Sequence, residues 1–330
     1  MTSLDSQKLQ QSIESSSVFA ESILEEAGQV IVGQQVLLER LVLAFLCDGH
    51  VLLEGLPGLA KTLTIKTLAD ILDVSFNRIQ FTPDLLPSDL VGTTIYNPKT
   101  GEFTPKKGPI FASLVLADEI NRAPAKVQSA LLEAMGERQV TIADTTYPLD
   151  SFFSVLATQN PIEQEGTYPL PEAQLDRFLF KVKVNYPTLQ EERTILNRMS
   201  GSAIPKVKRI CKAETILQAR ALCEQIYIDE KLKDYILRLV FASRFPAKHG
   251  LERMSRWIAV GCSPRATLSL ARASRAQAFL KRRSYVTPGD VKSIAHDVLR
   301  HRLVLSFEAQ AEGIDADKIV SELLENVQAP

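Results

Sequence analysis

Short apolar runs alternate with helix-like patterns over the first half of the chain. The runs have no helical period and lie at 51–53, 74–79, 113–117, 153–157 and 178–184. Apolar side chains at helical spacing occupy the segments between them, as in 63–72 and 125–135. Strands that alternate with helices favour a parallel sheet covered on both faces. We therefore predict an α/β domain built on five parallel strands.

The second half of the chain has helical patterns and few strand signals. The segment 185–188, Asn-Tyr-Pro-Thr, is the expected hinge, and helices are predicted at 189–199, 214–227, 230–243, 264–281 and 288–303. Ser263-Pro264 and Thr287-Pro288 each place a capping residue before a proline that suits the first helical turn. The predicted domains are a helical lead-in (1–29), the α/β domain (30–187) and a smaller all-α lid (188–330).

A hairpin is predicted inside the α/β domain. Residues 92–96 and 102–105 can pair across a turn at 97–101, after a short helical stretch between two prolines. The hairpin therefore interrupts the second helix of the domain, as an insert at about 83–112. Residues 139–142 and 146–149 predict a second hairpin.

A glycine-containing loop follows the first strand. It comprises Gly55, Leu56, Pro57, Gly58, Leu59, Ala60, Lys61 and Thr62, and a helix begins near Leu63. Such a loop directs backbone N–H groups inward, and the helix N-terminus adds positive partial charge, so together they bind phosphates. Lys61 is expected to reach the β- and γ-phosphates of a nucleotide, and Thr62 to bind Mg²⁺.

Ala60 departs from the usual pattern, which has a glycine before the lysine. Alanine does not tolerate a strongly positive φ at that position. An ordinary strand–helix turn is therefore the alternative. Upstream, Val32 and Gly33 belong to an apolar segment, 30–34, that suits one wall of an adenine pocket. A simple turn between two helices explains the same segment.

Polar residues follow two later strands. Asp118 and Glu119 come directly after the run at 113–117, where two carboxylates beside a phosphate loop predict a magnesium-orienting residue and a base for the attacking water. Helix capping explains only one of them. Asn160, after the run at 153–157, suits a hydrogen bond to that water or to the γ-phosphate, although a turn-forming role before Pro161 is the alternative.

Composition and charge limit the functional classes. Of the 330 residues, 45% are hydrophobic and 23% are charged, which is ordinary for a globular protein. No apolar stretch approaches the roughly 20 residues of a membrane span, and the polar start lacks a signal core. We expect a cytoplasmic protein. The four scattered cysteines argue against a zinc site or a disulfide framework.

The net charge of −1 combines a first part, residues 1–187, at −9 and a second part, residues 188–330, at +8. Opposite signs suit copies that meet head to tail, a basic half that faces a polyanion, or merely a solvated surface. Because no basic surface interleaved with aromatic residues is visible, nucleic-acid binding is not expected.

Taken together, these motifs resemble the AAA+ ATPases in order and spacing. The resemblance rests on 55–62, 114–119, 155–160 and Leu-Asp-Arg-Phe at 175–178, and the inserted hairpin resembles the helix-2-insert branch. The strings 118–124, 157–168 and 170–178 are similar to the MoxR family specifically. The phosphate loop of this chain, Gly-x-Pro-Gly-Leu-Ala-Lys-Thr, also resembles that family's version of the loop. The resemblance covers roughly residues 30–300.

The resemblance implies a role for each matching residue. Lys61 and Thr62 hold phosphates and Mg²⁺, Asp118 orients the metal, Glu119 is catalytic and Asn160 is the first sensor. Arg177 is the arginine finger of a neighbouring subunit's site, with an ion pair to Asp176 or Glu172 as the alternative.

Arg265 lies in a first helical turn, where a cation is unfavourable unless a phosphate lies nearby. It resembles the family's second sensor, and a plain surface arginine is the alternative. For Arg122 and Arg138, ion pairs are favoured over roles at a subunit interface.

The resemblance also implies an ATP-hydrolysing ring, with six subunits expected, that remodels or matures a partner protein. Relatives are associated with proteins that carry von Willebrand factor A domains and with metal or cofactor insertion, so such a client is expected. A nucleotide-gated recruitment module with incidental turnover is one alternative, and a DNA-acting motor is another.

Overall fold

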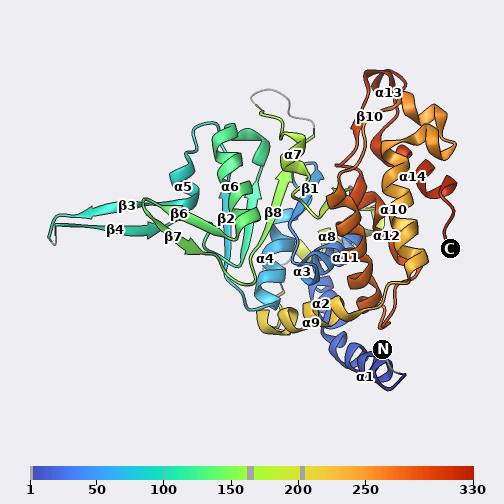
Figure 1. Ribbon diagram of the computed structural model, residues 1–330. Coiled ribbons are helices and arrows are strands. Elements are labelled where there is room, and N and C mark those ends of the chain that lie inside the picture. Colours follow the sequence, from blue (N-terminus) through green and yellow to red (C-terminus); the bar gives the residue numbers. More distant parts are fainter. Residues whose placement is uncertain (1–2, 100, 162–166, 201–204) are drawn as a thin grey trace. The chain divides into compact units, whose positions relative to one another are not determined.

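The computed structural model describes residues 3–99, 101–161, 167–200 and 205–330, and the chain divides into two compact units (Figure 1). An α/β unit comprises Glu21–Phe178 and Val182–Leu217. A helical unit takes Leu179–Lys181, Gln218–Pro330 and the described residues up to Ala20. The domain boundaries expected from the sequence stay a prediction.

The α/β unit is built on the predicted parallel sheet of five strands. The strand order is β2-β5-β8-β1-β9, and the strands are β1 (Val51–Gly55), β2 (Phe76–Gln80), β5 (Leu114–Asp118), β8 (Ser154–Gln159) and β9 (Phe180–Val184). Glu54 pairs with Gln159, and Gln80 pairs with Asp118. Because the strands run in parallel, their carboxyl ends meet at one edge of the sheet.

Helices cover both faces of this sheet, which explains why the strands are continuous apolar runs. Val115 and Ala117 of β5 are fully buried in a core cluster that also contains residues of α5 (Pro87–Val91) and α6 (Ala125–Glu137). The alternate residues of β5 point to the opposite face, where α4 (Lys61–Ile71) contacts β2 and β5.

Two hairpins extend from the α/β unit and lie side by side at their bases (Figure 1). They are formed by β3 (Gly92–Asn97) with β4 (Glu102–Lys107) and by β6 (Gln139–Ile142) with β7 (Thr145–Pro148). Both were predicted. The first follows α5 directly, but no helix resumes after it, because residues 108–113 lead into β5 through turns.

The other helices of this unit flank the strands in sequence. They are α3 (Gln35–Leu46), the 3-10 turn η1 (Ile120–Arg122), α7 (Glu172–Leu175) and α8 (Leu189–Met199), while α2 (Val18–Gly28) and α9 (Ala213–Gln225) cross the boundary between the units. Helix α7 has only one turn and begins at Glu172, because Pro171 is its N-cap and a proline cannot continue a helix toward the N-terminus.

The helical unit holds α1 (Ser3–Ser16) and most of the chain after α9. Its elements are α10 (Glu230–Arg244), η2 (Pro246–His249), η3 (Glu252–Arg256), α11 (Pro264–Leu280), α12 (Pro288–Leu299), α13 (Phe307–Ala311) and α14 (Ala316–Asn326). The sequence did not indicate the short antiparallel pair β10 (Ile258–Val260) and β11 (Val304–Leu305). Both predicted caps form, at Ser263 and at Thr287.

An acidic side chain is buried in the core of the helical unit. Asp290 lies in the first turn of α12 with no exposed side-chain surface, and the Arg283 guanidinium donates to both of its carboxylate oxygens, at 2.6 and 2.9 Å. Burial by itself raises the pKa of Asp290, but hydrogen bonds from Arg283 and Thr287 outweigh it, so the net shift is downward.

None of the helices that the structure describes has the length and apolar character that a membrane span requires.

Candidate nucleotide site

The loop between β1 and α4 is held closed by its own lysine. The Lys61 Nζ donates a hydrogen bond to the Gly55 carbonyl oxygen at 2.7 Å. Gly55 must be a glycine for a packing reason, since a Cβ there would lie 2.8 Å from the Val184 carbonyl oxygen. Strand β1 can therefore approach β9 closely at the point where the loop begins.

Two residues of this loop have a positive φ. Gly58 has φ of 82°, and Ala60 has φ of 55° and ψ of 20°, in the left-handed region. Ala60 thus adopts the conformation for which glycine is usually required, at a cost of about 1 kcal/mol. The left-handed backbone at position 60 is therefore formed without a glycine.

The loop and the carboxyl ends of three strands enclose one cavity of about 420 Å³. Its lining includes ten residues predicted from the sequence, namely Pro57, Gly58, Leu59, Ala60, Lys61, Thr62, Leu63, Asp118, Glu119 and Asn160. The remaining lining residues are Arg78, Gln80 and Thr158. The N-terminus of α4 opens into this cavity, so its unpaired N–H groups favour an anion there.

Thr158, which is buried, fixes the two acidic residues. Its hydroxyl donates to Asp118 Oδ1 at 2.6 Å and accepts from the Glu119 backbone N–H at 2.8 Å. Glu119 needs such support, because its φ of 56° and ψ of 50° place a non-glycine residue in the left-handed region. One hydroxyl on β8 therefore orients both the carboxylate of Asp118 and the backbone of Glu119.

Strand β2 supplies two further polar side chains. The Arg78 guanidinium forms an ion pair with Asp118 Oδ2 at 2.6 Å, and Gln80 Nε2 donates to Glu119 Oε2 at 2.9 Å. Sequence reasoning missed both residues. Arg78 and Gln80 are polar residues at alternate positions of β2, and this pattern would have indicated them as site residues only if the pairing of β2 with β5 had been known.

The Lys61 amine is half-buried beside these carboxylates. Burial lowers the pKa of Lys61, and the negative charges of Asp118 and Glu119 oppose this shift. Lys61 is therefore a cation of this cavity that is partly removed from water and can bind a strongly charged anion.

The donor atoms at Thr62 and Asp118 suit a magnesium ion. A hydroxyl and a carboxylate are hard oxygen ligands, and Mg²⁺ in phosphate-transfer sites takes few protein ligands together with water and phosphate oxygens. Both residues line the cavity. The residues present therefore fit Mg²⁺.

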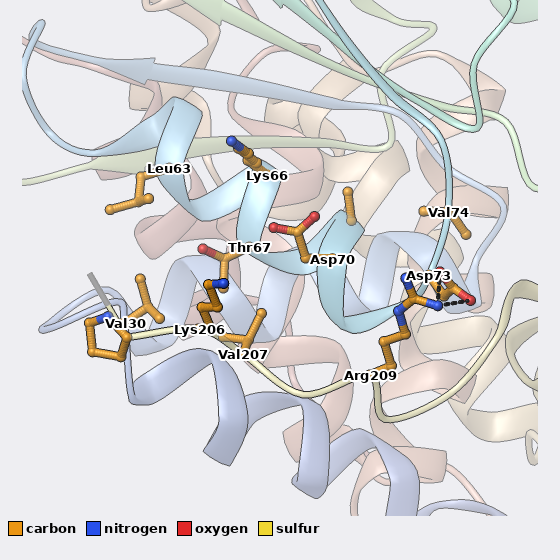
Figure 2. Close-up of a pocket in the computed structure, with 12 residues that line it drawn as sticks. Val30, Leu63, Lys66, Thr67, Asp70, Asp73, Val74, Lys206, Val207 and Arg209 are labelled. Carbon is orange, nitrogen blue, oxygen red and sulfur yellow. Dashed lines mark hydrogen bonds and ion pairs between the residues drawn. The ribbon is translucent and has the colours of Figure 1, made fainter. Parts of the chain in front are cut away.

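A second cavity, of about 490 Å³, lies along α4 in the same unit (Figure 2). Leu63 lines both cavities, and Val30 and the segment 205–209 close the second one. Figure 2 shows Lys66, Thr67 and Asp70 following Leu63 along the helix. The two cavities thus share a lining residue in the first turn of α4.

Several predicted residues do not line the first cavity. Val32 and Gly33 lie upstream of α3, and a Cβ at Gly33 would lie 2.6 Å from the carboxylate carbon of Glu191. Arg177 is exposed and donates to the Leu132 carbonyl oxygen at 3.0 Å. Arg265 belongs to the helical unit. The predicted roles of these four residues stay predictions.

Arg122 and Arg138 form the ion pairs that the sequence analysis favoured. The Arg122 Nε lies 3.0 Å from Glu119 Oε2, and the Arg138 Nη2 lies 2.7 Å from Asp48 Oδ1. Part of one string that carried the family resemblance, residues 162–166, lies outside the described residues.

Comparisons with known proteins agree with this geometry. A model of the "ATPase family associated with various cellular activities (AAA)" matches residues 50–180, and an "AAA lid domain" model matches residues 251–323. "Chaperone MoxR1" of Mycobacterium tuberculosis is 49% identical over 94% of this chain and 82% of its own length. "Protein MoxR" of Methylorubrum extorquens is 30% identical over 92% of this chain and 93% of its own. A crystal structure of a Cytophaga hutchinsonii protein is 49% identical, with a TM-score of 0.92 over 99% of this chain and 98% of that one.

Proposed function

Since this chain belongs to the MoxR family of AAA+ ATPases, we propose that it binds ATP with Mg²⁺ and hydrolyses it to ADP and phosphate. The observation that carries the proposal is the single cavity shared by the phosphate loop, Lys61, Thr62, Asp118, Glu119 and Asn160. In this proposal the phosphates lie at the N-terminus of α4. The adenine lies near Leu63 and Val30, where the second cavity begins.

The proposed roles follow from the chemistry of each side chain. Lys61 binds the β- and γ-phosphates, and Glu119 accepts a proton from the attacking water. Asn160 donates to the γ-phosphate or to that water. Thr62 and Asp118 are the residues that would hold Mg²⁺, which when bound neutralises charge on the phosphate oxygens.

Glu119 carries two contacts that bear on this role. Gln80 donates a hydrogen bond to its Oε2 at 2.9 Å, and the Arg122 Nε forms an ion pair with the same oxygen at 3.0 Å. The same contacts fix the direction of the side chain beside the cavity.

Hydrolysis is tested with two variants and a matched control. We expect Glu119→Gln to bind ATP and to lower kcat by 10²- to 10⁴-fold, because it removes only the base. Lys61→Ala should weaken ATP binding itself. Glu133→Gln makes the same chemical change at an exposed residue of α6 and should leave turnover unchanged. Normal turnover by Glu119→Gln would contradict the assignment of the base.

We also propose that the active form is a ring, with six subunits expected, in which Arg177 completes the site of a neighbouring copy. The exposed position of Arg177 at the surface of the α/β unit supports this role. Mixing Lys61→Ala with Arg177→Ala subunits should restore part of the activity, because some sites then have both an intact loop and an intact arginine. No recovery in confirmed mixed assemblies would count against it.

The proposed biological role is the remodelling or maturation of a partner protein, including metal or cofactor insertion. The name "Chaperone MoxR1" of a relative with 49% identity supports a chaperone-like role. A protein with a von Willebrand factor A domain is the expected client. Capture by the ATP-bound Glu119→Gln protein, with Lys61→Ala as the control, tests this role; equal capture by both would contradict nucleotide-dependent recruitment.

A further inference from the structure

Gln128 is a fully buried polar residue in the first turns of α6, and the site described above does not use it. Its Nε2 lies within hydrogen-bond distance of three backbone carbonyl oxygens: Ile120 at 3.2 Å, Ala123 at 3.1 Å and Tyr168 at 3.1 Å. The first two belong to one segment of the chain, and the third lies some 45 residues further along. One carboxamide therefore joins two separate segments.

The first segment is the turn that follows Glu119. This turn begins with the left-handed backbone of Glu119 and continues as η1, closed by a 2.9 Å hydrogen bond from the Arg122 N–H to the Glu119 carbonyl oxygen. A non-glycine residue in this conformation persists only when its surroundings hold it there. Gln128 donates to the carbonyl oxygens of Ile120, the first residue of η1, and of Ala123, which follows η1. These hydrogen bonds stabilise the turn.

The second segment runs from Tyr168 to Arg177. It is tied to the first turn a second time, since the Tyr168 N–H donates to the Asn121 carbonyl oxygen at 2.7 Å. Further along, Gln174 Nε2 lies 3.3 Å from Ser129 Oγ, and Arg177 donates to the Leu132 carbonyl oxygen at 3.0 Å. Helix α6 therefore supports both segments, and Gln128 is the one described α6 side chain that donates to both.

The chemistry of this position requires a hydrogen-bond donor. A carboxamide has two N–H groups, so three carbonyl acceptors share them. The opposite oxygen, Gln128 Oε1, accepts no hydrogen bond within the described part of the chain. Rotating the amide would place that oxygen against three carbonyl oxygens, which fixes the orientation of the group.

We infer that Gln128 is a positioning residue that couples the turn of the catalytic Glu119 to the segment that ends at Arg177. Each carbonyl that shares the amide constrains the others, so a displacement of one segment disturbs the other. In a ring, the two segments serve different sites: Glu119 acts in its own subunit, and Arg177 acts on the neighbour. The inference rests on the proposed function for these two roles.

Hydrogen exchange tests the coupling without any activity. In Gln128→Met, which has a similar volume but no donor, amides of 119–123 and of 168–177 should both exchange at least 10-fold faster than in the unaltered protein. Gln128→Asn keeps the donor but shortens its reach, and it is the second variant if the first folds poorly. Leu131→Met, a buried change on the same helix, is the control and should leave both segments protected. Faster exchange in only one segment would overturn the inference.

Mixed assemblies test the same coupling by function. Gln128→Met subunits should work poorly with Lys61→Ala subunits, which supply Arg177, and equally poorly with Arg177→Ala subunits, which supply an intact site. In both mixtures kcat should fall at least 10-fold relative to the same mixture made with unaltered subunits in place of Gln128→Met. KM for ATP should stay unchanged, because the subunits that hydrolyse ATP keep an intact phosphate loop. If Gln128→Met subunits that supply Arg177 support the same activity as unaltered subunits in that role, the coupling is refuted.

The control mixture separates the two proposals. If Lys61→Ala and Arg177→Ala subunits do not complement each other, the proposed role of Arg177 fails, and hydrogen exchange alone decides the coupling. If they complement and Gln128→Met serves both roles normally, only the coupling fails.

Discussion

Replacing Thr158 by valine should disable the site without adding a charge or changing the side-chain volume. The hydroxyl of Thr158 makes two partly buried contacts, a 2.6 Å hydrogen bond to the Asp118 carboxylate and a 2.8 Å hydrogen bond from the Glu119 N–H. Valine removes both. The Glu119 N–H then stays in the left-handed turn with no acceptor from this side chain.

The size of the effect follows from these two contacts. A hydrogen bond to a charged group contributes about 1.5–3 kcal/mol, and a buried donor left without a partner costs about 1–3 kcal/mol. The contacts share one hydroxyl and are not additive, so we expect a loss of roughly 2–4 kcal/mol. For a unit of this size, that corresponds to a fall in Tm of roughly 5–15 °C.

Thermal unfolding of the nucleotide-free protein measures this loss, with Thr158→Ser as the matched control. Serine keeps the hydroxyl and removes only a buried methyl group, at a cost of about 1 kcal/mol. The Mg²⁺ concentration for half-maximal ATPase activity should rise by about 10- to 100-fold in Thr158→Val, as for other groups that orient a metal ligand. If the valine and serine variants unfold at the same temperature and need the same Mg²⁺, the hydroxyl does not organise the carboxylates.

Three further predictions address other parts of the structure. Because burial lowers the pKa of Lys61, the folded protein loses that proton more readily than the unfolded chain. The urea midpoint of the unaltered protein should therefore rise relative to that of Lys61→Met as the pH approaches 10.5. A constant difference between the two midpoints would contradict this. Arg283→Met leaves the buried Asp290 with only its weaker partners, so it should lower the free energy of unfolding by about 3 kcal/mol, whereas Arg282→Met, at an exposed position, should change urea unfolding little. Ala60→Gly relieves the left-handed strain but raises the conformational entropy of the unfolded chain. The free energy of unfolding measured in urea should therefore be unchanged or raised by up to about 1 kcal/mol, and a clear fall would refute the reasoning.

The sequence predicted most of the sheet and the core of the site, for identifiable physical reasons. Strands buried on both faces are continuous apolar runs, so β5 and β8 were recognisable without an alignment. A polar residue directly after such a run must lie at the carboxyl edge of the sheet, which is why Asp118, Glu119 and Asn160 were found.

Two of the missed residues lie on a strand whose neighbour the sequence does not specify. Strand β2 has exposed polar residues at alternate positions, and Arg78 and Gln80 face the acidic residues only because β2 pairs with β5. Thr158 was missed for a different reason. It directly follows the run at 153–157, but an uncharged threonine is common in strands and does not by itself indicate a site. The predicted roles of Arg177 and Arg265 concern contacts beyond one unit, and they stay predictions.

The conformation of Ala60 bears on how phosphate loops are found in genomes. A search pattern that demands glycine before the lysine would reject this chain, although its backbone at that position has φ of 55°. Such a pattern should also accept other small residues at that position. The loop requires a left-handed backbone there, and an alanine can adopt it at a cost of about 1 kcal/mol.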